Sequence, residues 1–232
     1  MKRFLKISGI LLGAAILALV IFLWIKHEPL PQGTAGPKAD GLAQKMLTAL
    51  NHDAYKSTRY LEWSYQGGRN QYVWDKDMGR VQVRWADHVV QLNLVNPQKS
   101  VAKTHEKVLS GEEKTDKIDT ALKNFNNDSF WLVAPYKVFD KGTQRSIVTL
   151  DDGSVGLLVT YSSGGTTPGD SYLWLLNENG FPYAYKMWVE IIPVGGLKAT
   201  WDDWIITESG AYLPKSHDLG PLTLDMGSVR GY

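Results

Sequence analysis

The sequence contains no cysteine in its 232 residues. The chain therefore has no disulfide bond, no thiolate nucleophile and no site for lipid attachment through an N-terminal cysteine. An excess of charge of one sign is also lacking, because 25 basic residues face 24 acidic residues and leave a net charge of +1. Nucleic acid is bound by basic surfaces that release counterions, so this balance gives no reason to expect a nucleic-acid partner.

Catalytic and metal-binding motifs are missing as well. The chain has no HExxH pair, no GxSxG elbow and no phosphate loop that ends in GK[ST]. The adjacent carboxylates at 151–152 and 202–203 point to opposite faces of a strand and so do not converge on one metal. We therefore expect no catalytic residue, no metal and no cofactor. The histidines stand apart from one another, at His27, His52, His88, His105 and His217.

Long hydrophobic runs are scarce, and the exception lies at the N-terminus. Lys2, Arg3 and Lys6 precede residues 7–25, a run of nineteen residues without a charge, which is long enough to cross a bilayer as a helix. No small-residue cleavage site follows this run directly. We expect residues 1–26 to be an uncleaved signal anchor, with the bulk of the chain on the outer side of the membrane. A longer signal peptide, cleaved between residues 33 and 36, is the alternative.

Residues 27–40 form a Pro/Gly-rich linker, and residues 41–232 are long enough for one domain with its own core. Two segments have the apolar spacing of helices. They are residues 41–51, which Asp40 can cap, and residues 110–127, which open with a Ser110–Glu113 capping box. Elsewhere apolar residues alternate between Gly-rich turns, which predicts strands at 61–65, 72–74, 81–85, 89–95, 130–139, 144–150, 155–161, 171–176, 184–192, 198–207 and 212–218.

These elements predict a mainly β domain with two covering helices. A single antiparallel meander of about 10 or 11 strands tends to curl. We expect a half-open antiparallel β-barrel whose concave face is covered by the two amphipathic helices. The glycine-rich segment at residues 162–171 is interpreted as a long hairpin loop between two of these strands.

Aromatic residues are abundant, with nine tryptophans and eleven tyrosines. Each ring on its own is most simply a core residue, but the tryptophans recur on most of the expected strands. A half-open sheet with more rings than two helices can cover would form an apolar pocket for acyl chains, or for sugar rings that stack on indole. The expected ligand-binding residues are Trp63, Trp74, Trp85, Trp131 and Trp174. The expected lid is the helix face of Ile118, Leu122 and Phe125.

Three segments carry a resemblance to a known family. They are AQKMLTALNHDAYKSTRYLEWSY at the start of the domain, NDSFWLVAPYKVFDKG at 127–142 and TWDDWIITESGAYLPKSHDL at 200–219. Together with the order of the expected elements, they resemble an uncharacterised branch of the lipoprotein-carrier (LolA/LolB) superfamily. The resemblance implies an unclosed β-barrel capped by helices, an apolar cavity for lipid or lipoprotein acyl chains, and a Gram-negative periplasmic location. It also implies a cavity arginine, for which Arg59, Arg69 and Arg84 are the candidates.

The sequence leaves three hypotheses for function. The first is a binding module, tethered to the inner membrane by a single N-terminal span and facing the periplasm, that holds a lipid or a lipoprotein acyl chain. The second is an envelope structural or assembly protein with a filled core and an exposed apolar patch for protein partners. The third is a β-barrel hydrolase that uses Asp202 or Asp203 with His217, and it requires a carboxylate–histidine contact inside a pocket.

Overall fold

The computed structural model describes residues 13, 24–163 and 168–232. The expected membrane-spanning run, residues 7–25, lies almost entirely outside these residues. Within the part of the chain that is described, no helix is both long and apolar enough to cross a membrane. The expected domain, from residue 41 onward, is covered except for residues 164–167.

The strands form three antiparallel sheets. The six-stranded sheet contains β1 (Thr34–Ala35), β8 (Thr143–Thr149), β9 (Val155–Tyr161), β10 (Ser171–Leu176), β11 (Pro182–Trp188) and β12 (Leu197–Thr200), in that order. The three-stranded sheet contains β13 (Asp203–Ile206), β14 (Tyr212–Leu219) and β15 (Leu222–Asp225). The seven-stranded sheet contains β16 (Arg230–Gly231), β2 (Tyr60–Tyr65), β3 (Asn70–Asp75), β4 (Arg80–Trp85), β5 (His88–Asn93), β6 (Val101–Thr104) and β7 (Lys107–Val108).

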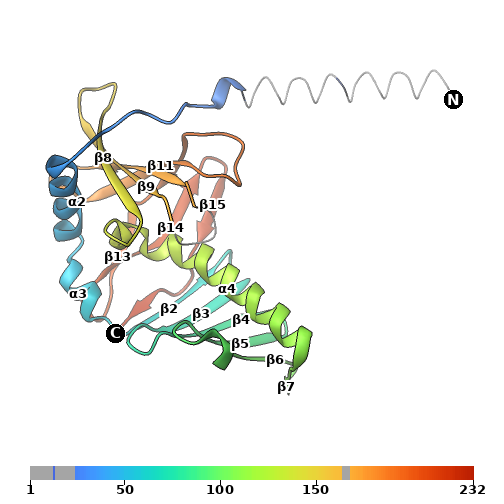
Figure 1. The fold of residues 1–232 in the computed structure, drawn as a ribbon. Helices are drawn as coiled ribbons and strands as arrows, with labels where there is room; N and C mark the ends of the chain where they lie inside the picture. Colours follow the sequence, from blue (N-terminus) through green and yellow to red (C-terminus); the bar gives the residue numbers. More distant parts are fainter. Residues whose placement is uncertain (1–12, 14–23, 164–167) are drawn as a thin grey trace, which may run out of the picture.

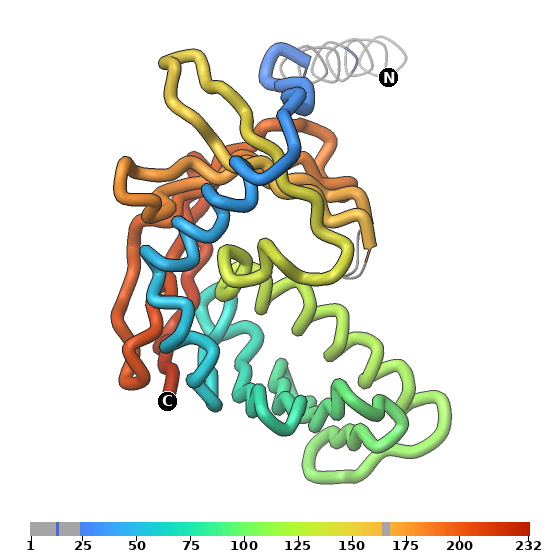
Figure 2. Tube along the Cα trace, turned by 60° about the vertical axis from the view of Figure 1, so that its left-hand side comes forward, coloured from blue at the N-terminus to red at the C-terminus, as the bar shows by residue number. Residues whose placement is uncertain are grey.

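The helices lie against these sheets, as Figures 1 and 2 show. The long helix α4 contacts β5 and β6 of the seven-stranded sheet and reaches β14 at its other end. Helix α2 contacts β8 and β9 of the six-stranded sheet. The helical elements in the described residues are α2 (Pro37–Ala49), α3 (His52–Ser57), α4 (Gly111–Val133) and the short 3-10 turns Pro97–Lys99 and Ala134–Lys137.

The three sheets follow one another through neighbouring strands. Strand β12 contacts β14, β15 contacts β2, and the C-terminal strand β16 pairs with β2. Both views place the six-stranded and seven-stranded sheets at opposite ends of the molecule, with α4 running from one toward the other. The predicted mainly β fold with antiparallel strands and covering helices is therefore confirmed. The single meander is not, because the strands divide into three sheets, none of which is closed into a barrel.

The seven-stranded sheet shows why its sequence alternates. Cross-strand register places Leu61 opposite Trp74, Trp74 opposite Val81 and Val81 opposite Leu92, all on the inner face toward α4. A strand turns successive side chains to opposite faces, so the residues between these positions form the outer face. The inner face is mostly buried, whereas the outer face is largely polar.

Two expected strands are wrong. The strand expected at residues 130–139 is helical instead, because α4 continues to Val133 and is followed by the 3-10 turn Ala134–Lys137. The helix continues because Phe125 and Leu132 keep the helical spacing of buried residues, and Pro135 cannot extend it further. Residues 198–207 form two strands in different sheets, because the chain leaves its strand at Trp201 and Asp202 before β13 begins.

The expected helix starts also need correction. Ser110 is the N-cap residue of α4, but its side chain makes no capping hydrogen bond, so the capping box with Glu113 is not formed. Helix α2 begins at Pro37, so Asp40 lies in its first turn and does not cap it. Proline suits the first helical position because its missing N–H would have no partner there.

Candidate functional site

Four aromatic rings meet between α4 and the inner face of the seven-stranded sheet, and we call them the helix-covered cluster. Trp63 stacks on Tyr72 with ring centroids 4.6 Å apart. Phe125 of α4 meets the edge of Trp74 at 5.2 Å and lies 6.3 Å from Trp63. Register explains the grouping, because Trp63 lies directly opposite Tyr72 on the neighbouring strand and Trp74 lies two residues further along on the same face. The cluster forms an aromatic surface with α4 as its cover.

Two polar atoms in this cluster have no partner. The indole nitrogens of Trp63 and Trp74 are buried and form no hydrogen bond. Buried polar atoms are nearly always paired, and an unpaired donor costs about 1–3 kcal/mol. Trp74 as a whole is only half-buried, although its nitrogen is covered. The two indole nitrogens beneath α4 are therefore covered and unpaired, although part of the Trp74 side chain is exposed.

A buried carboxylate holds α4 to this sheet. Asp128 is only 2% exposed and accepts hydrogen bonds from Asn70 Nδ2 at 2.7 Å and from the Tyr72 hydroxyl at 2.5 Å. Its other oxygen accepts a bond from Asn127 Nδ2 at 2.8 Å. Because Tyr72 also stacks on Trp63, the polar network and the helix-covered cluster share a side chain. The helix is thus held by directional bonds as well as by apolar contact.

Burial dominates the titration of this network. Removal from water raises the pKa of the Asp128 carboxyl, although its bonds from Asn70, Tyr72 and Asn127 act in the opposite direction. The same burial, together with the nearby Asp128 charge, raises the pKa of Tyr65 to about 12 and that of Tyr72 further. Arg69 lies close enough to favour the ionised form of Asp128. The carboxyl is therefore easier to protonate than an exposed aspartate.

The three residues of the expected lid lie on α4 as predicted by their spacing. Phe125 is 5% exposed and belongs to the helix-covered cluster. Ile118 and Leu122 are only half-buried and pack against the same core from the N-terminal part of the helix. The cover is thus tight at Phe125 and more open toward the end of α4 that lies over β5 and β6.

The five expected ligand-binding tryptophans do not share one site. The structure brings Trp63 and Trp74 together, and it places Trp85 beside His88, 5.1 Å away, at the far end of the same sheet. Trp131 and Trp174 lie instead in a second group, where the six-stranded and three-stranded sheets meet the end of α4. We call this group the sheet-junction cluster, and its rings are Trp131, Trp174, Tyr185, Trp201, Trp204 and His217.

The sheet-junction cluster is densely packed. Trp174 is fully buried and meets Tyr185 at 5.1 Å and Trp201 at 5.0 Å, in both cases edge to face. Trp131 packs on Tyr185 at 5.7 Å. Edge-to-face rings at these distances are the favourable arrangement for a filled aromatic core. For Trp174 the core interpretation therefore fits the geometry better than the lining of a cavity.

The buried histidine of this cluster does not form the pair that a hydrolase requires. His217 is fully buried, with Nδ1 2.8 Å from the Thr200 carbonyl and Nε2 2.7 Å from the Trp131 carbonyl. Burial lowers its pKa, and the two carbonyls oppose that shift. Asp203 instead accepts a hydrogen bond from Ser216 at 2.8 Å. Both ring nitrogens face backbone carbonyls and not a carboxylate, so His217 joins α4, β12 and β14 and lacks the carboxylate contact that the hydrolase requires.

None of the three candidate arginines projects beneath α4. Arg59 forms a two-pronged ion pair with Asp75, at 3.2 Å and 2.9 Å. Arg69 is exposed in the turn between β2 and β3, and Arg84 is exposed on the outer face of β4. Among the described residues there is also no group of three or more His, Asp or Glu side chains placed to hold a metal ion.

Sequence reasoning missed the polar members of the site, namely Asp128, Asn70 and Tyr72 in its bonding role. A signal was present, because Asp128 lies three residues after Phe125 and four before Leu132 and therefore falls on the buried face of the helix. It was overlooked because the expected helix ended at residue 127. An acidic residue on an apolar helix face predicts a buried, hydrogen-bonded carboxyl.

Comparisons with known proteins yield a distant structural similarity. No protein-family model and no curated protein sequence matches the chain. Among solved structures, the chain is similar to a DUF1329 family protein from Desulfovibrio piger, with 10% sequence identity and a TM-score of 0.42. The alignment covers 83% of this chain and 92% of that protein. At this identity and TM-score the likeness assigns neither a family nor a function.

Proposed function

We propose that the domain binds an apolar chain, such as a lipid or the acyl chain of a lipoprotein, on the aromatic surface that α4 covers. The observation that carries the proposal is that Trp74 is only half-buried beneath a single amphipathic helix, whose own residues Ile118 and Leu122 are also only half-buried. The indole nitrogens of Trp174 and Trp201 in the sheet-junction cluster are also buried and unpaired, so what sets this surface apart is its cover by one helix that leaves Trp74 half-buried. In this proposal α4 is the lid, and Phe125 occupies the place that the ligand takes.

The energetics fit an apolar ligand. Aromatic rings give rigid apolar area, and burying such area contributes roughly 25 cal/mol per Å². An acyl chain makes few directional demands, so it suits an aromatic surface whose unpaired polar atoms are the two indole N–H groups. The lid must exchange its own contacts for those of the ligand, so only the difference between the two appears as affinity. Ile118 and Leu122 are only half-buried, so we expect the part of α4 that carries them to separate from the sheet at a lower cost in free energy than the part that carries Phe125.

The proposal also includes the attachment of the domain to the membrane and its location in the cell. The domain has three antiparallel sheets, none of which is closed into a barrel, and helices that contact them. The N-terminal run at residues 7–25 would tether this domain to the inner membrane, on its periplasmic side. A membrane-tethered module of this kind would bind its ligand next to the bilayer that supplies it.

An envelope assembly role remains the second candidate, because one observation favours it. The sheet-junction cluster is a filled aromatic core, which is what a purely structural protein needs. Exposed apolar side chains such as Ile191, Ile206 and Leu222 are 55–72% exposed and are available to protein partners. The two candidate functions therefore differ in the role of the helix-covered cluster, which is a ligand-binding surface in the first and part of the core in the second.

Native mass spectrometry of the full chain, purified in a mild detergent from a Gram-negative host, tests the proposal. Leu122→Asn places a polar group on the covered face of α4, and Lys123→Asn is the matched control on the exposed face of the same helix. We expect a co-purifying acyl lipid with the wild type and the control, and at least about tenfold less with Leu122→Asn.

Lipid bound only by the N-terminal segment would be the same in all three proteins. Equal loading of the wild type, Leu122→Asn and Lys123→Asn, with all three folded by circular dichroism, would therefore reject the aromatic surface as a binding site. The helix-covered cluster would then be core, and the assembly role would be favoured.

A further inference from the structure

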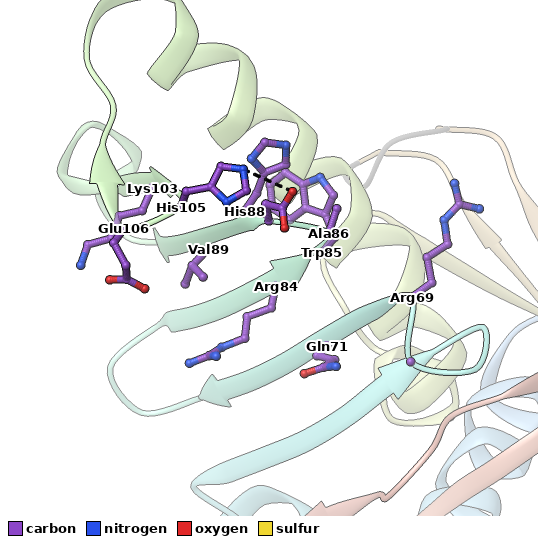
Figure 3. Close-up of a pocket in the computed structure, with 12 residues that line it drawn as sticks. Arg69, Gln71, Arg84, Trp85, Ala86, His88, Val89, Lys103, His105 and Glu106 are labelled. Atoms are coloured by element: carbon purple, nitrogen blue, oxygen red, sulfur yellow. Dashed lines mark ion pairs between the residues drawn. The ribbon is translucent and has the colours of Figure 1, made fainter.

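A second, different kind of site lies at one corner of the seven-stranded sheet. A pocket of about 480 Å³ forms where the turns β2–β3, β4–β5 and β6–β7 come together. Figure 3 shows Arg84 and Gln71 projecting on one side of the sheet, while Trp85 and His88 lie on the side of α4. The pocket thus opens mainly on the outer face, away from the helix-covered cluster.

Strand register builds the floor of this pocket. Gln71 lies opposite Arg84, Arg84 opposite Val89, and Val89 opposite Lys103, so these residues form one row across four adjacent strands. Arg84 and Lys103 are two strands apart, which is about 10 Å at the usual strand spacing. Both side chains are long enough to reach a common ligand between them.

The charges in this row are not neutralised. Arg84 and Lys103 form no ion pair with a carboxylate within the described part of the chain, and neither does Arg69 at the pocket's edge. The carboxylate of Asp87, which also lines the pocket, lies 3.4 Å from the Nε2 atom of His105. The lining of the pocket therefore contains the basic side chains of Arg84 and Lys103, with Arg69 at its edge, and two acidic side chains, one of which lies beside His105.

The turns around the pocket are held in a costly backbone conformation. Among the described residues, five that are not glycine have a positive φ, and three of them line this pocket: Ala86 at 45°, His105 at 44° and Glu106 at 66°. Such a conformation costs about 1–3 kcal/mol per residue and is concentrated where function fixes the backbone. Short left-handed turns here bring the ends of four strands around one space.

We propose that this pocket binds an oxyanion, that is, a phosphate or carboxylate group of a larger ligand. The Arg84 guanidinium, whose Nε and one terminal nitrogen lie 2.8 Å and 3.1 Å from the side-chain amide of Gln82, can exchange these bonds for two oxygens of such a group. Lys103 supplies a second positive charge from the other end of the row, and the amide of Gln71 supplies a neutral hydrogen-bond donor. This function is independent of the acyl-chain proposal, because it uses the opposite face of the sheet.

A neighbouring hollow gives room for the rest of the ligand. A second pocket of about 410 Å³ shares Gln71 and Arg84 with the first and continues over the outer face toward Ser64 and Gln82. Both hollows are lined mainly by polar groups. A polar molecule that carries one oxyanion, such as a lipid headgroup or a soluble phosphorylated or carboxylated compound, matches this surface.

Titration of the full chain with inorganic phosphate, followed by the NMR signals of the arginine side chains, tests the site directly. We expect saturable shifts at Arg84 and at least about tenfold weaker binding in Arg84→Gln and Lys103→Gln. Arg84→Lys keeps the charge but loses the planar fork, so it should also weaken binding. Arg80→Gln is the matched control, because Arg80 is exposed on the same face of the same strand at its other end.

Sedimentation with vesicles separates the two sources of the oxyanion. Binding to phosphatidylglycerol vesicles beyond that to phosphatidylcholine vesicles, lost in Arg84→Gln but kept in Arg80→Gln, would identify a lipid headgroup. Phosphate shifts at Arg84 without this difference would identify a soluble ligand. The proposal is overturned if neither probe responds to Arg84→Gln, or if Arg80→Gln weakens binding as much. Lipid co-purification with Leu122→Asn is unaffected by any of these results, so the two proposals fail separately.

Discussion

The helix-covered cluster and the sheet-junction cluster use the same residue types in different ways. In the sheet-junction cluster Trp174 and Trp201 are fully buried and their rings meet edge to face. In the helix-covered cluster Trp74 is half-buried, and a carboxylate is bonded to the neighbouring Tyr72. Sheets pack against sheets in the first case, whereas in the second a single helix lies on a sheet. An aromatic surface covered by one helix is the easier one to open, and this is why we propose that the ligand binds there.

The largest difference between the two clusters should appear in stability. Trp174→Ala removes a fully buried indole, and we expect it to lower the free energy of unfolding by about 3–5 kcal/mol. Trp74→Ala removes an indole that is only half-buried, so we expect roughly half that loss or less. Urea denaturation of both variants measures the contrast. Equal losses would show that both clusters are rigid core.

The next prediction concerns the histidine that joins α4 to the sheet junction. His217→Leu keeps an apolar side chain between Trp131 and Trp201 but removes the ring nitrogens that meet the Thr200 and Trp131 carbonyls. We expect a loss of about 1–3 kcal/mol from the unpaired buried groups, and more from the lost ring contacts. Thermal unfolding measures the loss. An unchanged melting temperature would mean that the histidine does not hold the helix.

Asp128 tests the bond between α4 and the helix-covered cluster. Asp128→Ala leaves the buried Tyr72 hydroxyl without its acceptor, and we expect a loss of about 1–3 kcal/mol. Asp128→Asn keeps one oxygen that can accept from Tyr72 and Asn70, so the loss should be smaller. If Asp128 is a latch for the lid, Asp128→Ala should also speed ligand uptake. An alanine variant as stable as the asparagine variant would show that the Tyr72 bond contributes nothing.

The fold could be predicted from the sequence wherever one face of a strand is buried. Alternation in β2, β4 and β5 is clear because their outer residues are polar. The short strands β1, β7 and β16 have only two residues each and leave no periodic signal. The division into three sheets was missed because it depends on local breaks, such as the one at Trp201 and Asp202, that alternation does not mark.

The candidate site was only partly predictable, for a different reason. Spacing placed Ile118, Leu122 and Phe125 on one face of a helix, which needs only local geometry. Trp63 and Trp74 were grouped with Trp131 and Trp174 because nothing in the sequence states which strands adjoin. Pairing of Asp128 with Asn70 and Tyr72 spans more than fifty residues of chain, a distance over which residue type alone carries no register.

The smallest expected effect is a pH dependence that belongs to the helix-covered cluster alone. Burial raises the pKa of Asp128 above its unfolded value of 3.8, so the folded protein binds the proton more tightly. The resulting stabilisation is fully present below the unfolded pKa and is lost as pH rises through the folded pKa. Ion-paired carboxylates such as Asp75, whose pKa is lowered to about 2 by the hydrogen bond from Arg59, change stability in the opposite direction and at lower pH.

Subtracting the unfolding curves of Asp128→Asn from those of the wild type cancels these other groups and isolates the Asp128 contribution. We expect the difference to favour the wild type most at acidic pH and to decline as pH rises, then to level off once Asp128 is ionised in the folded state. A difference that grows with pH would mean that the bonds from Asn70, Tyr72 and Asn127 outweigh burial. Asp128 would then be a permanent ionic anchor of α4, and a lid that opens at neutral pH would have to break its strongest bonds first.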